Sequence, residues 1–428
     1  MKYRKMENSE VLEKVIRNHP SLQQLFGIFD EIHQETGDRY FLVGGFVRDI
    51  LLGETSTDID IAVEGTIDKI IHKVNNQIDS EYIYYERFQT ATLKLEDLKI
   101  DLITCRKESY DHDGALPIIV PGRFEDDIWR RDFTINAMAI EVSKKDEFIL
   151  CCPKLAEDDL ENGQIRILHD RSFYEDPTRI FRAIRYMCRL GFEMEANTQK
   201  QLIDAIENGA PSKVSSDRVF SEICRDLNEK AAYDILRAYQ DWNLDQFIAP
   251  GLKLPLKLKD DLAMLDRLEL RFIEDTENFD PCELRLLAVF HHNYNKAQAF
   301  IEKFHLSKRF SNMLMSMEKL SARIKAANSE IKNSQIYDAF LDIQDEVLLT
   351  LYVCTETMLV KNIIERYYTK LKNVINPVKG SDLLKVGVQP GPKVRELLNE
   401  VMNAHLDGII ENRDDAIEYV KSRVEEMQ

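Results

Sequence analysis

The segment Asp58-Ile59-Asp60 places two carboxylates two residues apart in an apolar stretch that is typical of a strand. Alternate residues of a strand face the same side, so both carboxylates should point the same way. Two close carboxylates repel and raise each other's pKa unless a cation lies between them. Mg²⁺ prefers oxygen ligands and commonly bridges carboxylates to the phosphates of a substrate. The pair therefore predicts a magnesium site with Asp58 and Asp60 as ligands.

A third acid, Asp101, lies within Lys99-Ile100-Asp101-Leu102-Ile103, an apolar strand that should be central in a sheet. Burying an aspartate there is costly unless the carboxylate is paired or bound to a metal. We therefore expect Asp101 to join the two acids, either as a metal ligand or as a base.

A glycine turn precedes these acids, in Val43-Gly44-Gly45-Phe46-Val47-Arg48-Asp49. It should join a strand to a helix, and glycine there lets the backbone approach a ligand while the first helical N–H groups favour an anion. An ordinary tight turn would look the same. The acids thirteen residues beyond Gly45 favour a ligand-binding role for this turn. Its candidate nucleotide-binding residues are Gly44, Gly45 and Arg48.

The segment 130–139 holds two arginines, an aspartate and an asparagine within seven positions, including Arg131, Asp132 and Asn136. A salt-bridged strand or helix start would explain the pattern without any ligand. Arginine also suits phosphate, because its planar guanidinium donates two parallel hydrogen bonds.

Glu175-Asp176-Pro177-Thr178-Arg179 is typical of a helix start, with Asp176 as the N-cap. Capping alone could explain the aspartate, but Arg179 lies three residues on, near the same face. A carboxylate and a guanidinium side by side match the amino group and ring nitrogen of cytosine or adenine. Guanine and uracil would leave buried groups unpaired, at about 1–3 kcal/mol each. The pair could thus select C and A without a nucleic-acid template.

Arg179, Arg182, Arg185 and Arg189 continue along this helix as one stripe. A solvated charged face is the usual explanation of such a row. Beside a nucleotide site, a groove facing phosphate is the alternative, and it makes Arg182 and Arg185 candidate nucleotide-binding residues.

The elements that must position these residues change in character along the chain. Short β-branched or aromatic segments at 40–43, 57–63, 81–85, 90–95 and 98–104 predict strands, and 23–36 predicts an amphipathic helix ahead of them. Beyond about residue 155 nearly every signal is helical, at 176–190, 198–208, 216–228, 231–242, 260–274, 316–325, 393–402 and 414–426. The fold class is therefore an α+β head followed by an elongated all-α region.

Composition limits the possible classes of protein. The chain of 428 residues carries a net charge of −18, which argues against nucleic-acid binding unless a local basic groove exists. No stretch approaches the ~20 apolar residues of a membrane span, and the N-terminus lacks a signal peptide's apolar core. We expect a cytoplasmic protein. The adjacent His291 and His292 form no metal-binding pattern.

The glycine turn, Leu51-Leu52-Gly53 and Asp58-Ile59-Asp60 together resemble the catalytic motif of class II tRNA nucleotidyltransferases, a family that includes bacterial poly(A) polymerases and belongs to the polymerase-β-like nucleotidyltransferases. The resemblance implies an antiparallel or mixed sheet in the head. It assigns Arg131, Asp132 and Asn136 to the sugar and triphosphate, and Asp176 with Arg179 to base selection. Asp217-Arg218 with Glu222 resemble a later motif that supports the site.

The resemblance also implies domains: a catalytic head at 1–150, a helical neck with the base-selecting motif at 151–235, a helical body at 236–330 and a tRNA-binding helical tail at 331–428. The Gly/Pro-rich stretch 380–392 is similar to the tail of many CCA-adding enzymes, although it could be ordinary helix punctuation. A polar stretch between 104 and 129 lies where the family has a flexible loop.

The activity implied is template-independent addition of CCA to the 3′ end of tRNA from CTP and ATP, with Mg²⁺ as cofactor and pyrophosphate as product. Partial CC-addition or A-addition and poly(A) synthesis are the nearest alternatives. A non-catalytic RNA-binding or scaffold protein is an alternative of another class, and the intact acids argue against it.

Overall fold

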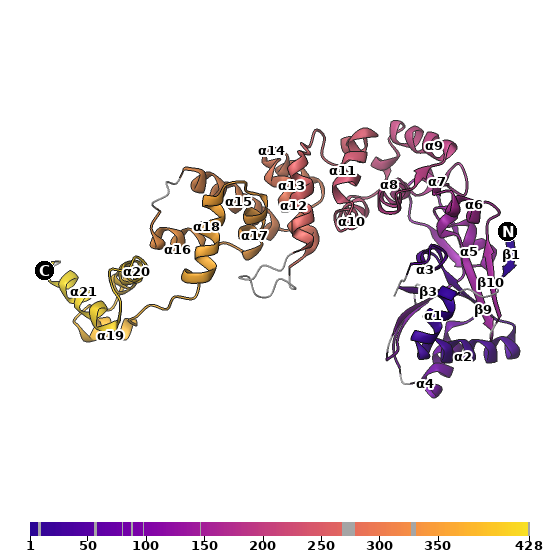
Figure 1. The fold of residues 1–428 in the computed structure, drawn as a ribbon, viewed down its shortest axis with the longest axis horizontal. Helices are drawn as coiled ribbons and strands as arrows, with labels where there is room; N and C mark the ends of the chain where they lie inside the picture. Colours follow the sequence, from indigo (N-terminus) through magenta and orange to yellow (C-terminus); the bar gives the residue numbers. More distant parts are fainter. Residues whose placement is uncertain are drawn as a thin grey trace. The chain divides into compact units, whose positions relative to one another are not determined.

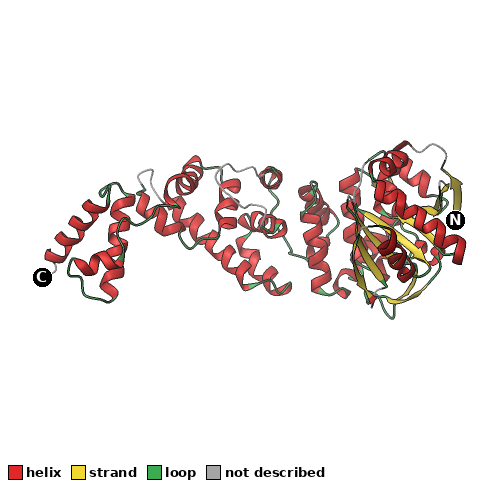
Figure 2. Cartoon of the chain, turned by 90° about the horizontal axis from the view of Figure 1, so that it is seen from below, coloured by secondary structure: helices red, strands yellow, loops and turns green. Residues whose placement is uncertain are grey.

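The computed structural model describes residues 1–6, 10–54, 58–78, 80–86, 89–96, 98–145, 147–267, 279–326 and 331–426. The chain divides into two compact units. Unit 1 comprises Met1–Asp226 and Ala238–Phe247, and unit 2 comprises Leu227–Arg237 and Ile248–Gln428. Figure 2 shows that the strands belong to unit 1, whereas unit 2 is built of helices. No helix among the described residues is long and apolar enough to cross a membrane.

Unit 1 contains an eight-stranded sheet with the order β1-β10-β9-β2-β3-β6-β5-β4. Strands β3 and β6 run parallel, and the other neighbours in this sheet are antiparallel. The strands are β1 (Lys2–Lys5), β2 (Arg39–Val43), β3 (Ile59–Glu64), β4 (Glu81–Tyr85), β5 (Thr90–Lys94), β6 (Lys99–Thr104), β9 (Ala139–Lys144) and β10 (Glu147–Cys152). The predicted mixed sheet is confirmed.

Helices cover both faces of this sheet (Figure 1). On one face, α2 (Pro20–Thr36) packs with α4 (Ile67–Gln77), and Phe29 stacks on Tyr40 with ring centroids 4.2 Å apart. On the other face, α5 (Phe124–Trp129) packs on β2 and β3, and Phe124 stacks on Phe41 at 3.7 Å. Strand residues therefore alternate between two apolar layers, which fixes the face that each polar residue of β3 occupies.

The remaining elements of unit 1 are short helices, and small strands join them. They are α1 (Glu10–Asn18), α3 (Gly45–Leu51), β7 (Arg106–Ser109), β8 (Ile118–Pro121), η2 (Thr134–Asn136), α6 (Ala156–Glu161), β11 (Gln164–Ile165), α7 (Ser172–Glu175), α8 (Thr178–Leu190), β12 (Glu193–Met194), α9 (Ala196–Glu207), η3 (Ala210–Lys213), α10 (Ser216–Leu227), α11 (Ala232–Asp241) and η4 (Leu244–Phe247). The chain passes between the two units after Asp226, after Arg237 within α11, and after Phe247.

Unit 2 is entirely helical in its described part. Its helices are α12 (Leu256–Asp266), α13 (Pro281–His291), α14 (Tyr294–Lys303), α15 (Lys308–Ala326), α16 (Asn333–Phe340), α17 (Asp345–Cys354), α18 (Met358–Arg366), η6 (Tyr367–Leu371), α19 (Gly380–Lys385), α20 (Pro392–Leu406) and α21 (Arg413–Glu426). The last three share a core that includes Leu383, Leu397 and Val401. Asp407 ties this core to α16, since Ser334 donates its backbone N–H and hydroxyl to the two carboxylate oxygens.

The predicted segments agree closely with the observed elements where the sequence pattern was strong. The strand predicted at 57–63 is β3, although residue 57 lies outside the described residues. The helix predicted at 260–274 is observed earlier, as α12, and residues 268–274 lie outside the described residues. The stretch 104–129, predicted to be a polar loop, contains the β7–β8 ribbon and α5. The four-domain division stays a prediction.

Candidate functional site

Asp60 on β3 and Asp101 on β6 are direct register partners across the parallel strand pair. Register partners have side chains on the same face, so the structure brings these two predicted acids together. Thr92 on β5 is in turn the partner of Asp101, and its hydroxyl donates to Asp101 Oδ1 at 2.6 Å. Asp58 is exposed and lies immediately before β3.

Burial raises the pKa of Asp60 to about 6; the charges of Asp58 and Asp101 add to this shift, and Arg131 opposes it. A cation among these carboxylates would relieve their repulsion. Within the described residues, however, no group of three His, Cys, Asp or Glu side chains is arranged to hold a metal ion. Mg²⁺ is commonly held by one or two carboxylates together with substrate phosphates. Asp58 and Asp60 fit that donor set, with the nucleotide supplying the rest.

The glycine turn lies at the end of β2, where Val43 is the register partner of Asp60. Gly44 has φ +73° and ψ −137°, a backbone conformation that residues other than glycine avoid. A Cβ on Gly44 would stand 3.3 Å from Nη1 of Arg131, so the arginine approaches the bare backbone. The sequence predicted that a ligand approaches the backbone of this turn. In the structure the guanidinium group of Arg131 makes that close approach. Helix α3 begins at Gly45.

Arg48 of α3 is buried and donates Nη1 to Asn136 Oδ1 at 2.7 Å. Asn136 donates Nδ2 to Asp132 Oδ1 at 3.1 Å, and Arg182 of α8 donates Nε to Asp132 Oδ2 at 2.7 Å. Burial alone would raise the pKa of Asp132, but Arg182 and Asn136 hold it below its ordinary value. Four predicted nucleotide-binding residues from distant segments thus form one hydrogen-bonded chain.

Asp127 is a buried acid that the sequence analysis missed. It accepts hydrogen bonds from Arg130 at 2.6 Å and from Arg131 at 2.9 Å. Burial opposes ionisation of Asp127, yet the two arginines keep its pKa below the ordinary value. The detectable signal was helical spacing, because Asp127 lies three and four residues before the arginines. Nε of Arg131 is buried without a hydrogen-bond partner in the structure.

Asp176 and Arg179 lie at the start of α8, and each side chain is bonded to the protein around it. Thr178 donates its backbone N–H and its hydroxyl to Oδ1 of Asp176, as the capping interpretation predicts. Arg218 of α10 donates to the same oxygen at 2.8 Å. Arg179 is buried and donates to the Ser172 hydroxyl at 2.7 Å and to a backbone carbonyl, that of residue 130, also at 2.7 Å. The pair is held in place, and Oδ2 of Asp176 takes none of these bonds.

Arg185 takes different partners from those of its helix neighbour Arg182. Its guanidinium is buried, donates to Glu222 of α10 at 2.5 Å and also pairs with Asp226. Tyr239 donates its hydroxyl to Asp226 as well. The structure therefore does not bring Arg185 together with Arg48, Asp132 and Asn136. Its nucleotide-binding role stays a prediction.

The tip of the β7–β8 ribbon is tied to the neighbouring helical segments of unit 1. Asp113 pairs with Arg171 at 2.6 Å and with Lys213 at 2.9 Å. Gly114 donates its backbone N–H to the carbonyl of Tyr174 at 3.0 Å. This ribbon occupies the stretch where the sequence suggested a flexible loop.

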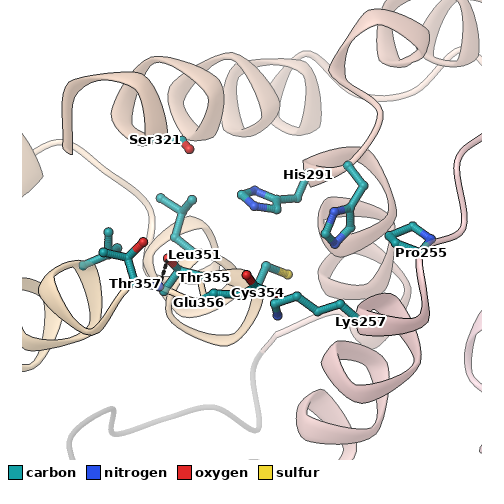
Figure 3. Close-up of a pocket in the computed structure, with 11 residues that line it drawn as sticks. Pro255, Lys257, His291, Ser321, Leu351, Cys354, Thr355, Glu356 and Thr357 are labelled. Atoms are coloured by element: carbon teal, nitrogen blue, oxygen red, sulfur yellow. Dashed lines mark hydrogen bonds between the residues drawn. The ribbon is translucent and has the colours of Figure 1, made fainter. Parts of the chain in front are cut away.

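Unit 2 holds a separate pocket of about 370 Å³ lined by Lys257, His291, His292 and Cys354, among others (Figure 3). The two histidine rings are nearly perpendicular, at 84°. His291 pairs with the Tyr294 hydroxyl, whereas His292 pairs with Asp261. Among the described residues, no group of three His, Cys, Asp or Glu side chains at this pocket is arranged to hold a metal ion.

The Gly/Pro-rich stretch in the tail feeds a helix, as expected. Gly391 has φ +149°, and Pro392 is the first residue of α20. A role of this turn in RNA binding stays a prediction.

The site and the fold that carries it define a nucleotidyltransferase head with a helical extension. Residues 40–166 match the family described as Poly A polymerase head domain, and residues 282–420 match tRNA nucleotidyltransferase domain 2. The chain belongs to the family of tRNA nucleotidyltransferases and poly(A) polymerases.

Individual relatives cover most of this chain. The A-adding tRNA nucleotidyltransferase of Geobacter sulfurreducens is 31% identical over 88% of the chain, but the match spans only 44% of that relative's length. The CCA-adding enzyme of Leuconostoc mesenteroides is 28% identical over 90% of the chain and 92% of the relative. The structure is similar to that of the Thermotoga maritima CCA-adding enzyme complexed with tRNA, with a TM-score of 0.74, 27% identity, and coverage of 99% of this chain and 100% of that one.

Proposed function

We propose that this chain adds the nucleotides of CCA to the 3′ end of tRNA from CTP and ATP, releasing pyrophosphate. The observation that carries the proposal is the pairing of Asp60 with Asp101 across β3 and β6, on the face to which Arg131 and the glycine turn also belong. The carboxylates can hold the metal ion that nucleotidyl transfer needs, and the arginines can bind the triphosphate.

The reaction is an in-line displacement at phosphorus. The 3′-hydroxyl oxygen of the acceptor bonds to the α-phosphorus, and the bond from that phosphorus to the bridging oxygen breaks. Pyrophosphate leaves with the electron pair, while the hydroxyl proton passes to Asp101 or to water. Mg²⁺ held by Asp58 and Asp60 would lower the hydroxyl's pKa and stabilise the charge that develops at phosphorus.

The hydrogen-bonded chain from Arg48 to Arg182 supports binding of the nucleotide's sugar and phosphates. Asp132 and Asn136 offer acceptors and donors that a ribose hydroxyl can share. Arg131 lies against Gly44 and has one guanidinium N–H without a protein partner. These features favour an anionic ligand with a sugar attached.

Base selection would come from Asp176 and Arg179. Oδ2 of Asp176 can accept from the amino group of cytosine or adenine, and Arg179 can donate to the ring nitrogen beside it. Ser172 and Arg218 hold the two side chains before the base arrives, so recognition costs little reordering. Guanine and uracil would place a carbonyl against the carboxylate and an N–H against the guanidinium, so these buried groups would stay unpaired.

The acceptor is proposed to be tRNA because relatives that cover most of this chain are tRNA nucleotidyltransferases, and one similar structure is complexed with tRNA. The cytoplasmic location predicted from sequence belongs to the same proposal. The second candidate is addition of the terminal A alone, which is favoured by the name of the Geobacter relative.

The deciding experiment offers the purified chain three tRNA transcripts, ending before CCA, after the first C and after CC, with CTP, ATP or both. The proposal predicts that every transcript is completed to CCA and no further. Extension of the CC transcript alone would identify an A-adding enzyme, and long A tracts would identify a poly(A) polymerase.

Asp60→Asn provides the matched control, because it keeps the size of the side chain and removes its charge. Loss of all extension in this variant excludes a contaminating transferase. If the wild-type chain binds tRNA but extends none of the transcripts, the proposal fails and the non-catalytic RNA-binding alternative stands.

A further inference from the structure

Tyr186 of α8 lies within the nucleotide-binding chain of residues, although no motif assigns it a role. Its ring centroid is 5.3 Å from Cζ of Arg48 and 5.5 Å from Cζ of Arg182. Nη2 of Arg182 also donates to the Tyr186 hydroxyl at 3.1 Å. An electron-rich ring thus contacts two guanidinium groups that come from α3 and α8.

With Tyr186 included, the hydrogen-bonded chain becomes a closed circuit. It runs from Tyr186 to Arg48, on to Asn136 and Asp132, then to Arg182 and back to Tyr186. Each arginine bonds to one amide or carboxylate of the circuit and shares the ring with the other arginine. Removing the ring would therefore loosen both arginines at once.

Each arginine also has a carboxylate partner. Arg48 donates Nη2 to Asp49 Oδ1 at 2.7 Å, and Arg182 pairs with Asp132. The tyrosine ring attracts both guanidinium groups through its quadrupole and adds no further negative charge to them. Phe133 packs edge-on against the ring at 5.9 Å and fixes its orientation.

We propose that Tyr186 is a positioning residue for the nucleotide, whose ring contacts Arg48 and Arg182 together and holds the two guanidinium groups in the arrangement that receives the triphosphate. This inference rests on the proposed function, since it assumes that the circuit binds a nucleoside triphosphate. Tyr186 acts through the two arginines.

Two variants separate the ring from the hydroxyl. Tyr186→Phe keeps the ring and removes the acceptor used by Arg182, whereas Tyr186→Leu removes the ring. Tyr174→Leu is the matched control, because Tyr174 has a similar ring contact with Arg171, at 6.0 Å, outside the circuit. ATP binding without acceptor is measured by calorimetry, and KM and kcat for ATP are measured on a tRNA transcript that ends in CC.

We expect Tyr186→Leu to raise both the Kd and the KM for ATP about tenfold, which corresponds to about 1.4 kcal/mol. Its kcat and melting temperature should stay close to the wild-type values. Tyr186→Phe should stay within about threefold of wild type, because both ring contacts are kept and only the acceptor used by Arg182 is lost. Binding of adenosine, which has no phosphate, should change little in any variant.

Several results would overturn the inference. They are an unchanged Kd for ATP in Tyr186→Leu, an equal loss in Tyr186→Phe, an equal loss for adenosine, or an equal loss in Tyr174→Leu. A wild-type chain that binds ATP but extends no transcript would refute the proposed function, and the comparison of Kd values would still test the role of Tyr186.

Discussion

Asp60 and Asp101 lie directly opposite each other on the parallel strands β3 and β6, and Thr92 continues the same row on β5. The row marks a border on the sheet. Toward β2, the same face is covered by α5, where Phe41 and Phe124 stack. At the other edge of the sheet, strand β4 is largely exposed. The acids are therefore half-buried, enough to raise the pKa of Asp60 while leaving a substrate access.

Asp60→Asn should abolish nucleotide addition, with a loss of about 1,000-fold or more, because a ligand that stabilises charge at phosphorus is worth several kcal/mol. The measurement is single-turnover extension of a tRNA transcript. Substantial residual activity would contradict the assignment of Asp60 as a metal ligand.

The same variant should be more stable than wild type at neutral pH when metal is chelated. The folded pKa of about 6 lies above the ordinary value of 3.8, so the stability of the wild type falls as the pH rises through this range. The neutral asparagine side chain of the variant would carry no such penalty. The melting temperature of Asp60→Asn in EDTA should exceed that of wild type at pH 7.5 and match it near pH 4. A lower melting temperature at pH 7.5 would refute this reasoning.

Thr92→Val should reduce kcat about tenfold, since the hydroxyl that orients Asp101 is worth about 1.4 kcal/mol when its acceptor is charged. Thr92→Ser keeps the hydroxyl and should recover most of the rate. Thr90→Val changes a neighbour on the same strand and serves as the control. Equal losses in Thr92→Val and Thr92→Ser would mean that packing, and not the hydrogen bond, is responsible.

Gly44→Ala and Gly45→Ala form a matched pair. Gly44 has a positive φ, so alanine there costs about 1–3 kcal/mol and presses on Arg131. A Cβ on Gly45 would meet only the flexible end of Arg48, at 3.4 Å. We expect Gly44→Ala to raise the KM for both CTP and ATP and Gly45→Ala to change it less. Urea unfolding of both variants measures the stability difference, and the reverse order would contradict the proposed close approach.

Arg179→Ala should relax base choice, which is measured as the ratio of kcat/KM for ATP to that for GTP and UTP. Ser172→Ala should do so more weakly, because Arg179 then loses one of its two acceptors. Each unpaired group costs about 1–3 kcal/mol of discrimination, so the ratio should fall by about tenfold or more in Arg179→Ala. Unchanged rejection of GTP and UTP would remove the base-selecting role.

The sequence was sufficient for features that depend on local spacing. The alternation in the strand predicted that Asp60 faces away from Ile59 and Ile61. Pro177, which fits a first helical turn, predicted that Asp176 lies at a helix start, where its Oδ1 accepts from the Thr178 backbone N–H. The register between β3 and β6 could not be predicted in this way. It depends on the pairing of strands about forty residues apart, which the two apolar layers of the sheet decide together.

The hydrogen-bond partners that side chains find on other elements could not be predicted from the sequence either. Arg182 and Arg185 are three residues apart on α8 and share a predicted face, yet one bonds to Asp132 and the other to Glu222. Helical periodicity defines which residues share a face, but the elements that pack there decide the partners. Strands β9 and β10 were not predicted, because their sequences lack a clean alternation of polar and apolar residues. Several residues on both faces of these strands are buried.

This difference makes Arg185 a test between two roles. Arg185→Met would leave Glu222 and Asp226 as buried acids without the cation that faces both, at a cost of about 3–5 kcal/mol in the free energy of unfolding. The triple variant Arg185→Met, Glu222→Gln, Asp226→Asn removes the charges together and should recover most of this stability. If Arg185 only holds α8 against α10, the triple variant should keep a wild-type KM for ATP. A KM raised tenfold in a triple variant with restored stability would instead establish the nucleotide-binding role that the arginine stripe predicts.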